Sequence, residues 1–195
     1  MIKVAIIEDN NTIREGLAAL INGTSGYSCV GSFDDCESFL SKLDKLDVDV
    51  VLMDIGLPGM SGIDGIAKAK KIKPELNILM LTIYEDSQSV FKALCAGACG
   101  YLVKKTPPSR LLEAIKDANE GGAPMSSLIA RQVINVFRQT QGKISEEKEA
   151  VLSSREIEVL TSLSDGNNYQ EIAGRLFIAV DTVRHHIKNI YRKLH

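Results

Sequence analysis

Val48-Asp49-Val50-Val51-Leu52-Met53-Asp54-Ile55-Gly56-Leu57-Pro58-Gly59 joins a short apolar run to an acid and a turn-forming loop. Residues 48–53 are apolar at nearly every position, as expected for a strand that is buried on both faces of a sheet. Strand-like runs also occur at 2–7, 27–31, 77–82 and 99–103, and amphipathic helix-like segments separate them at 11–22, 35–45, 62–72, 85–97 and 108–120. This fivefold alternation predicts an α/β fold, a doubly wound five-stranded parallel sheet with helices on both faces.

Length and composition favour two unequal globular domains, since the chain has 195 residues, 45% apolar and 25% charged. No apolar run approaches the roughly 18 to 20 residues that cross a bilayer, so we expect no membrane span. The N-terminus lacks the pattern of a signal peptide. The four cysteines form no C-x-x-C pair, which favours small buried thiols and a cytoplasmic protein over a metal or redox site.

The sequence pattern changes after Gly121-Gly122-Ala123-Pro124. A connecting helix is expected through Ile129 and Phe137, followed by a polar stretch at 139–149 that has the composition of a mobile linker. Three further helical segments are expected from Leu152 onward, giving a small all-α domain. The predicted boundaries are therefore 1–122 for the α/β domain, 123–151 for the connecting helix and linker, and 152–195 for the helical domain.

The net charge of −2 hides an asymmetry between these parts. Residues 151–195 carry six basic and five acidic residues, whereas 1–150 carry 17 basic and 20 acidic ones. No acid follows Asp181, and four of the last twelve residues are Arg or Lys. A basic terminal element of this kind indicates a polyanionic partner.

Polar residues follow the predicted strands of the first domain. In a parallel sheet of this type, functional side chains gather beyond the carboxyl ends of the strands. The residues at these ends are Glu8 and Asp9, Asp54, Thr82 and Lys104. Clustered carboxylates repel one another unless a cation compensates them, and oxygen ligands completed by water favour Mg²⁺. The alternative, in which each acid only caps the following helix, is plausible for Asp9 or Asn10 alone but not for the whole set.

With Mg²⁺ and the Lys104 ammonium present, a carboxylate can act as a nucleophile toward a phosphoryl group. Asp54 is the best candidate because it lies between the other groups and an open loop follows it. Thr82 can then donate its hydroxyl to a phosphoryl oxygen.

Four motifs resemble the signature of two-component receiver domains over about residues 1–122: Glu8-Asp9, Met53-Asp54-Ile55-Gly56-Leu57-Pro58-Gly59-Met60-Ser61-Gly62, Leu81-Thr82 and Gly100-Tyr101-Leu102-Val103-Lys104. The resemblance implies a flavodoxin-like fold with Asp54 as phosphoacceptor and Glu8, Asp9, Asp54 and the Gly56 carbonyl as metal ligands. It also implies that Thr82 and Tyr101 form a switch pair and that Lys104 pairs with the phosphate. Taken alone, Tyr101 would be interpreted as a partly buried aromatic residue on an edge strand. Many receivers have a cis proline directly after the lysine, but Lys105-Thr106-Pro107 follows here, so no cis bond is expected.

The last predicted helix has one apolar face, formed by Val183, Ile187, Ile190 and Leu194. Cations on the opposite face are placed to meet phosphates and base edges in a major groove, although a solvated basic face has the same pattern. Residues 152–195 also resemble the LuxR-type helix-turn-helix, through Leu152-Ser153-Ser154-Arg155-Glu156, Glu171-Ile172-Ala173 and Thr182-Val183-Arg184-His185-His186-Ile187. The candidate DNA-binding residues are Thr182, Arg184, His185, Lys188 and Arg192.

Receiver, linker helix and helix-turn-helix together resemble the NarL/FixJ class of response regulators. The resemblance implies a DNA-binding regulator of transcription that is not an enzyme. It also implies a histidine kinase and double-stranded DNA as partners, and a homodimer on phosphorylation or DNA binding. Three departures concern DNA binding: Gln170 replaces a common lysine, Phe177 replaces a small turn residue and Ala179 replaces a capping serine. Relatives commonly continue beyond the Lys193-Leu194 pair, so we expect the last helix to be truncated, which affects dimerisation.

Three competing hypotheses come from other functional classes. A Mg²⁺-dependent phosphatase with an aspartate nucleophile typically needs a second acid two residues on, where this chain has Gly56. A flavin-binding electron carrier needs a phosphate-cradling loop after the first strand, but the residues there are acidic and lack glycine. The helical domain could also bind protein, in which case its affinity would not fall with rising salt.

Overall fold

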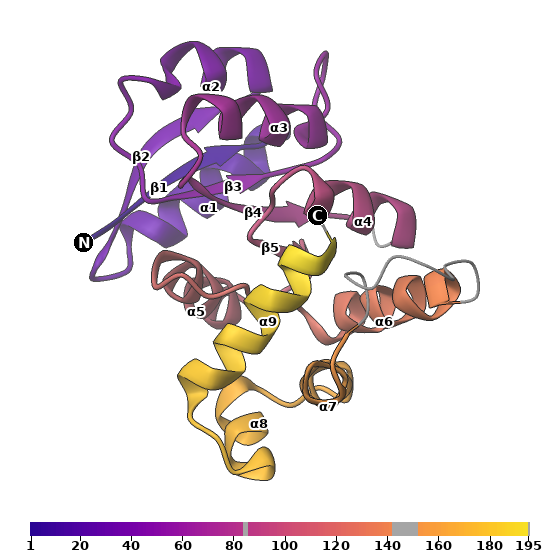
Figure 1. Ribbon diagram of the computed structural model, residues 1–195. Helices are drawn as coiled ribbons and strands as arrows, with labels where there is room; N and C mark the ends of the chain where they lie inside the picture. Colours follow the sequence, from indigo (N-terminus) through magenta and orange to yellow (C-terminus); the bar gives the residue numbers. More distant parts are fainter. Residues whose placement is uncertain (84–85, 142–151, 195) are drawn as a thin grey trace.

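The computed structural model describes residues 1–83, 86–141 and 152–194. Its single described sheet has five parallel strands in the order β2-β1-β3-β4-β5, which confirms the doubly wound fold (Figure 1). The strands are β1 Ile2–Ile7, β2 Tyr27–Phe33, β3 Val50–Met53, β4 Asn77–Thr82 and β5 Gly100–Val103. The strand β3 begins at Val50, two residues later than the predicted run at 48–53, and all its residues are buried as that run predicts.

Five helices connect and follow the strands: α1 Asn11–Asn22, α2 Cys36–Leu43, α3 Gly62–Ile72, α4 Ser87–Cys95 and α5 Pro108–Asn119. Side chains alternate along each strand, so the two faces of the sheet build two separate cores. One core contains Ile21 of α1 and Ile115 of α5, and the other contains Phe39 of α2, Ile66 of α3 and Leu94 of α4. Helices therefore cover both faces of the sheet.

The C-terminal part consists of α6 Ser127–Gln141, α7 Ser154–Ser164, α8 Tyr169–Leu176 and α9 Val180–Leu194. Ser153 and Asn168 cap α7 and α8, and each forms a capping box with the glutamate three residues on. Between α8 and α9 the backbone turns at Phe177, which has a φ of 54°. The helices α7, α8 and α9 contact one another and form the predicted small helical domain.

The C-terminal domain lies against the receiver-like domain. The helix α9 runs beside α5 and ends near α4, and α6 also contacts α4 (Figure 1). The apolar core on the α4 side of the sheet continues through Met125 and Ile129 into the C-terminal helices. The protein is therefore closed, with its two domains in contact.

Several sequence-based expectations can be compared with this structure. The helix α6 extends to Gln141, so residues 139–141 of the expected linker are helical, and the rest of that linker lies outside the described residues. Cys36 is buried, Cys29 and Cys99 are partly buried, and Cys95 is exposed, so the expectation of four buried thiols holds fully for Cys36 alone and was wrong for Cys95. All described peptide bonds are trans, including the bond before Pro107.

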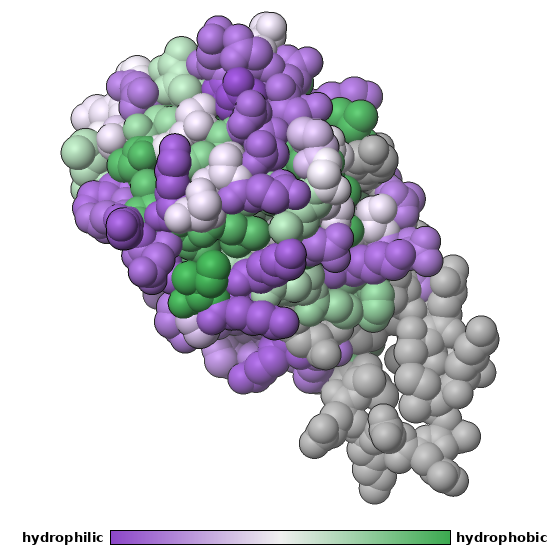
Figure 2. Space-filling model, turned by 90° about the horizontal axis from the view of Figure 1, so that it is seen from above, coloured by the Kyte–Doolittle hydropathy of each residue, from purple (hydrophilic) through white to green (hydrophobic). Residues whose placement is uncertain are grey.

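The surface on the side of α2 and α3 is mostly hydrophilic, with small hydrophobic patches between the polar side chains (Figure 2). Among the described helices, none combines the length and the apolar character that a membrane crossing requires.

Candidate functional site

Three carboxylates meet where β1 and β3 end. Glu8 and Asp9 directly follow β1, Asp54 directly follows β3, and the register pairs Ile7 with Met53. One carboxylate oxygen from each acid lies within 4.8 Å of the others. Glu8 and Asp54 are only 2% and 5% exposed, whereas Asp9 lies at the open rim. The parallel register therefore gathers acids that are more than 40 residues apart in the sequence.

Lys104 lies between the two buried acids. Its Nζ is 2.6 Å from Glu8 Oε2 and 2.9 Å from Asp54 Oδ2. Burial alone would lower the pKa of Lys104, but the hydrogen bonds from its ammonium to Glu8 and Asp54 raise it. Burial raises the pKa of Glu8, and Lys104 offsets this only in part. The second oxygen of Asp54, Oδ1, accepts a hydrogen bond from the Ile55 amide at 2.7 Å.

The acids fit a divalent cation. With all three acids ionised, one ammonium leaves an excess of two negative charges in a largely buried cluster, which a divalent ion would neutralise. All the side-chain donors are oxygens, and Asp9 is open to water, as suits the partly hydrated octahedron of Mg²⁺. Gly56 lies two residues after Asp54 in the β3–α3 loop and is exposed.

The cap interpretation of the acids can be tested at Asp9. Asn10, not Asp9, caps α1, because Asn10 Oδ1 accepts hydrogen bonds from the amides of Thr12 and Ile13 at 3.0 and 3.2 Å. Asp9 therefore has no need to serve as the cap.

Thr82 and Tyr101 lie on the neighbouring strands β4 and β5. Thr82 is the last residue of β4 and pairs with Val103 of β5, and the Lys104 amide donates to the Thr82 carbonyl at 2.9 Å. Both Thr82 and Tyr101 are completely buried. Tyr101 therefore belongs to the core on the α4 side of the sheet, and Thr82 lies on the next strand beside Lys104.

The sequence pattern assigned no role to three supporting residues, Arg14, Glu37 and Gly62. The Arg14 guanidinium donates to the carbonyls of Glu8 and Asp9 at 2.6 and 3.1 Å, which fixes the loop that carries these acids. Glu37 accepts from the Met60 amide at 3.0 Å and steadies the loop after Asp54. At Gly62 an added Cβ would lie 1.9 Å from the Asp54 carbonyl oxygen, so only glycine fits. The glycine at the end of the stretch Pro58-Gly59-Met60-Ser61-Gly62 was the sequence feature that could have indicated the close approach of the backbone at Gly62.

The candidate DNA-binding residues lie on or near one side of α9. Val183, Ile187 and Ile190 are fully buried, as the predicted apolar face requires. On the other side His185, Lys188 and Arg192 are exposed, and Thr182 is partly exposed. Arg184 differs from them, because its guanidinium is 2.6 Å from Asp117 and 3.3 Å from Glu120, both in or next to α5. Burial lowers the pKa of the neighbouring His186.

Comparisons with known proteins agree with this geometry. Residues 4–116 match the family model of the response regulator receiver domain, and residues 150–195 match that of the bacterial regulatory proteins of the luxR family. These two matches decide the family.

The chain is a response regulator of the NarL/FixJ class.

Full-length relatives support this assignment. The nitrate/nitrite response regulator protein NarP of Escherichia coli is 35% identical over 98% of this chain and 88% of its own length. The transcriptional regulatory protein LnrK of Bacillus subtilis is 33% identical over 100% of this chain and 91% of its own. A structure of the Salmonella typhimurium response regulator RcsB, described in terms of its dynamics for DNA interaction, is 25% identical with a TM-score of 0.64, covering 99% and 91% of the two chains.

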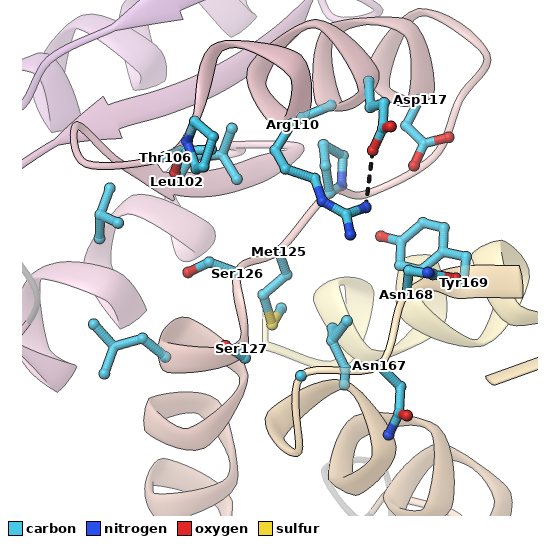
Figure 3. A pocket seen from close by; sticks show the side chains of 18 of the residues that line it. Leu102, Thr106, Arg110, Asp117, Met125, Ser126, Ser127, Asn167, Asn168 and Tyr169 are labelled. Atoms are coloured by element: carbon cyan, nitrogen blue, oxygen red, sulfur yellow. Dashed lines mark hydrogen bonds and ion pairs between the residues drawn. The ribbon is translucent and has the colours of Figure 1, made fainter. Parts of the chain in front are cut away.

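In this response regulator the two domains enclose a cleft of about 840 Å³. Thr106 and Arg110 line it from the receiver, Met125 lines it from the connecting segment, and Asn167 and Tyr169 line it from the C-terminal domain. Asp117 of α5 and Tyr169 of α8 lie near one another at its edge (Figure 3). The two domains are therefore not in contact over their whole interface. Where they do touch, the ion pair of Arg184 with Asp117 and the hydrogen bond from Tyr169 to the Ala123 carbonyl add to the apolar packing.

Proposed function

We propose that this response regulator accepts a phosphoryl group on Asp54 from a histidine kinase and thereby controls DNA binding by its C-terminal domain. The observation that carries the proposal is the cluster of Glu8, Asp9, Asp54 and Lys104, in which a buried carboxylate faces an ammonium at 2.9 Å. The proposed domains are the receiver at 1–122, the connecting helix and linker at 123–151, and the DNA-binding domain at 152–195.

Each residue of this site would have a different role in phosphoryl transfer. A carboxylate oxygen of Asp54 forms the new bond to phosphorus while the bond to the donor nitrogen or oxygen breaks. Lys104 pairs with the negative oxygens of the transferred group, and Thr82 donates its hydroxyl to one of them. Mg²⁺ held by Glu8, Asp9, Asp54 and the Gly56 carbonyl would neutralise further charge on the phosphoryl group when bound.

We propose that helix α9 is the part of the protein that binds DNA. The protein would bind double-stranded DNA as a homodimer on a two-fold site. The residues proposed to contact the DNA are Thr182, Arg184, His185, Lys188 and Arg192. The kinase partner and a cytoplasmic location are part of the same proposal. Hydrolysis of an external substrate is not part of the proposal, because Gly56 occupies the position where a phosphatase of this type needs a general acid.

The direct test is labelling of the full chain with acetyl phosphate and Mg²⁺, followed by mass spectrometry. We expect the wild type to gain one phosphoryl group on Asp54. The Asp54→Asn variant keeps the shape but loses the nucleophile, so it should gain none. Equal labelling of both proteins would contradict the proposal, and phosphorylation at another residue would place the acceptor elsewhere.

A further inference from the structure

Residues 123–126 lie along the free edge of β5. The Tyr101 amide donates to the Pro124 carbonyl at 3.1 Å, the Ser126 amide donates to the Tyr101 carbonyl at 3.5 Å, and Met125 forms a parallel bridge with Tyr101. Gly100 permits this approach, since a Cβ there would lie 2.5 Å from the Pro124 oxygen. The segment thus extends the sheet beyond the strand that carries the switch residue Tyr101.

The other side of the same segment holds the C-terminal domain through two tyrosines. Tyr169 of α8 donates its hydroxyl to the Ala123 carbonyl at 3.1 Å, and Tyr191 of α9 donates to the Pro124 carbonyl at 3.3 Å. Burial raises the pKa of both phenols, so both remain neutral donors at physiological pH. We call these two hydroxyls and the two carbonyls they reach the tyrosine clasp.

Two features connect the clasp to the switch and to the recognition helix. The Pro124 carbonyl accepts from the Tyr101 amide and from the Tyr191 hydroxyl, so strand β5 and helix α9 share one acceptor. Nearby, Arg184 of α9 pairs with Asp117 and Glu120. The four acceptors in these contacts are Asp117, Glu120, Ala123 and Pro124, which all lie within residues 117–124.

We propose that Tyr169 and Tyr191 are positioning residues that hold the DNA-binding domain on residues 117–124 and transmit the state of Tyr101 to it. A shift of the Tyr101 backbone moves the Pro124 carbonyl, which weakens the Tyr191 hydrogen bond and frees Arg184 from the acids. The role in signalling rests on the proposed function of Asp54, whereas the clasp itself is present without phosphorylation.

The test compares the full-length, unphosphorylated Tyr169→Phe/Tyr191→Phe variant with the wild type. Phenylalanine keeps the ring and removes only the hydroxyl. The probe is a 30-bp duplex of random sequence at low salt. Loss of two hydrogen bonds should raise the affinity of the variant about tenfold, toward that of the beryllofluoride-treated wild type. Small-angle scattering should show a larger radius of gyration for the variant.

Tyr27→Phe is the matched control, because the Tyr27 hydroxyl donates to the Leu112 carbonyl at 3.0 Å inside the receiver. It should change neither DNA affinity nor size. Asp117→Asn removes the negative charge that pairs with Arg184 and should act in the same direction as the double variant. If the double variant matches the wild type in both DNA affinity and radius of gyration, the clasp does not hold the domain.

The outcomes separate this inference from the proposed function. Failure of the wild type to be labelled at Asp54 would overturn the proposed function alone, since the clasp measurement uses unphosphorylated protein. If no protein binds DNA, the scattering result still decides the clasp. A double variant that opens but is still labelled at Asp54 like the wild type supports both.

Discussion

At the scale of single residues, the proposed phosphoacceptor site depends on residues that take no part in the chemistry themselves. Gly62 is the clearest case, because the Asp54 carbonyl oxygen occupies the space that its side chain would need. A Cβ at 1.9 Å forces the backbone after Asp54 to move, and with it the carboxylate that faces Lys104.

We therefore predict that Gly62→Ala destabilises the receiver domain by about 1 to 3 kcal/mol, the usual cost of overpacking. Labelling by acetyl phosphate should fall as well. The matched control is Gly16→Ala in α1, where nothing lies within 4 Å of an added Cβ, so a gain of about 0.5 to 1 kcal/mol is expected. Urea unfolding of the two variants measures this difference, and equal stabilities would refute the steric explanation.

At the scale of elements, periodicity in the sequence was sufficient to predict the fold. The apolar runs at 2–7 and 77–82 became strands with those limits, because continuous burial on two faces leaves a signal in every residue. Ends were less well predicted. The strand β2 continues to Phe33 rather than stopping at residue 31, since its partner β1 still offers backbone groups as far as Ile7.

The acidic site was predictable for a related reason: strand ends of a parallel sheet meet at one edge, whatever their distance in sequence. The packing of the two domains was not. No sequence pattern around Tyr169 or Tyr191 indicates a contact with the receiver. The position of Arg184 on its helix is equally compatible with a contact to DNA and with the ion pair to Asp117 that the structure shows. Such contacts depend on the orientation of whole domains, which local periodicity does not encode.

The turn between α8 and α9 leads to a prediction at this scale. Phe177 adopts left-handed backbone angles although it is 94% exposed, so its side chain gains almost no burial in return. Its amide and that of Ile178 close the end of α8 on the Gly174 and Ala173 carbonyls.

Phe177→Gly should therefore be about 1 kcal/mol more stable than Phe177→Ala, because both variants delete the exposed ring and only glycine removes the strain. Thermal unfolding of the full chain, followed by circular dichroism, measures the difference. An alanine variant as stable as the glycine variant would show that this turn is not strained.

At the scale of the whole molecule, the account describes a closed protein whose recognition helix is only partly available. His185 and Lys188 are exposed, but Arg184 is engaged by α5. Closed and open arrangements would be in equilibrium, and phosphorylation would shift their populations through the surface around β5. The affinity for DNA is then reduced by the fraction of molecules that are closed.

The central claim is that the state of Asp54 controls DNA binding, and one titration tests it. Full-length wild type and Asp54→Asn are each titrated with duplex DNA in Mg²⁺, with and without beryllofluoride. We predict that beryllofluoride increases the affinity of the wild type by about tenfold or more and leaves Asp54→Asn unchanged, as expected for release of a closed state. An unchanged wild-type affinity, or an equal increase in Asp54→Asn, would contradict the account.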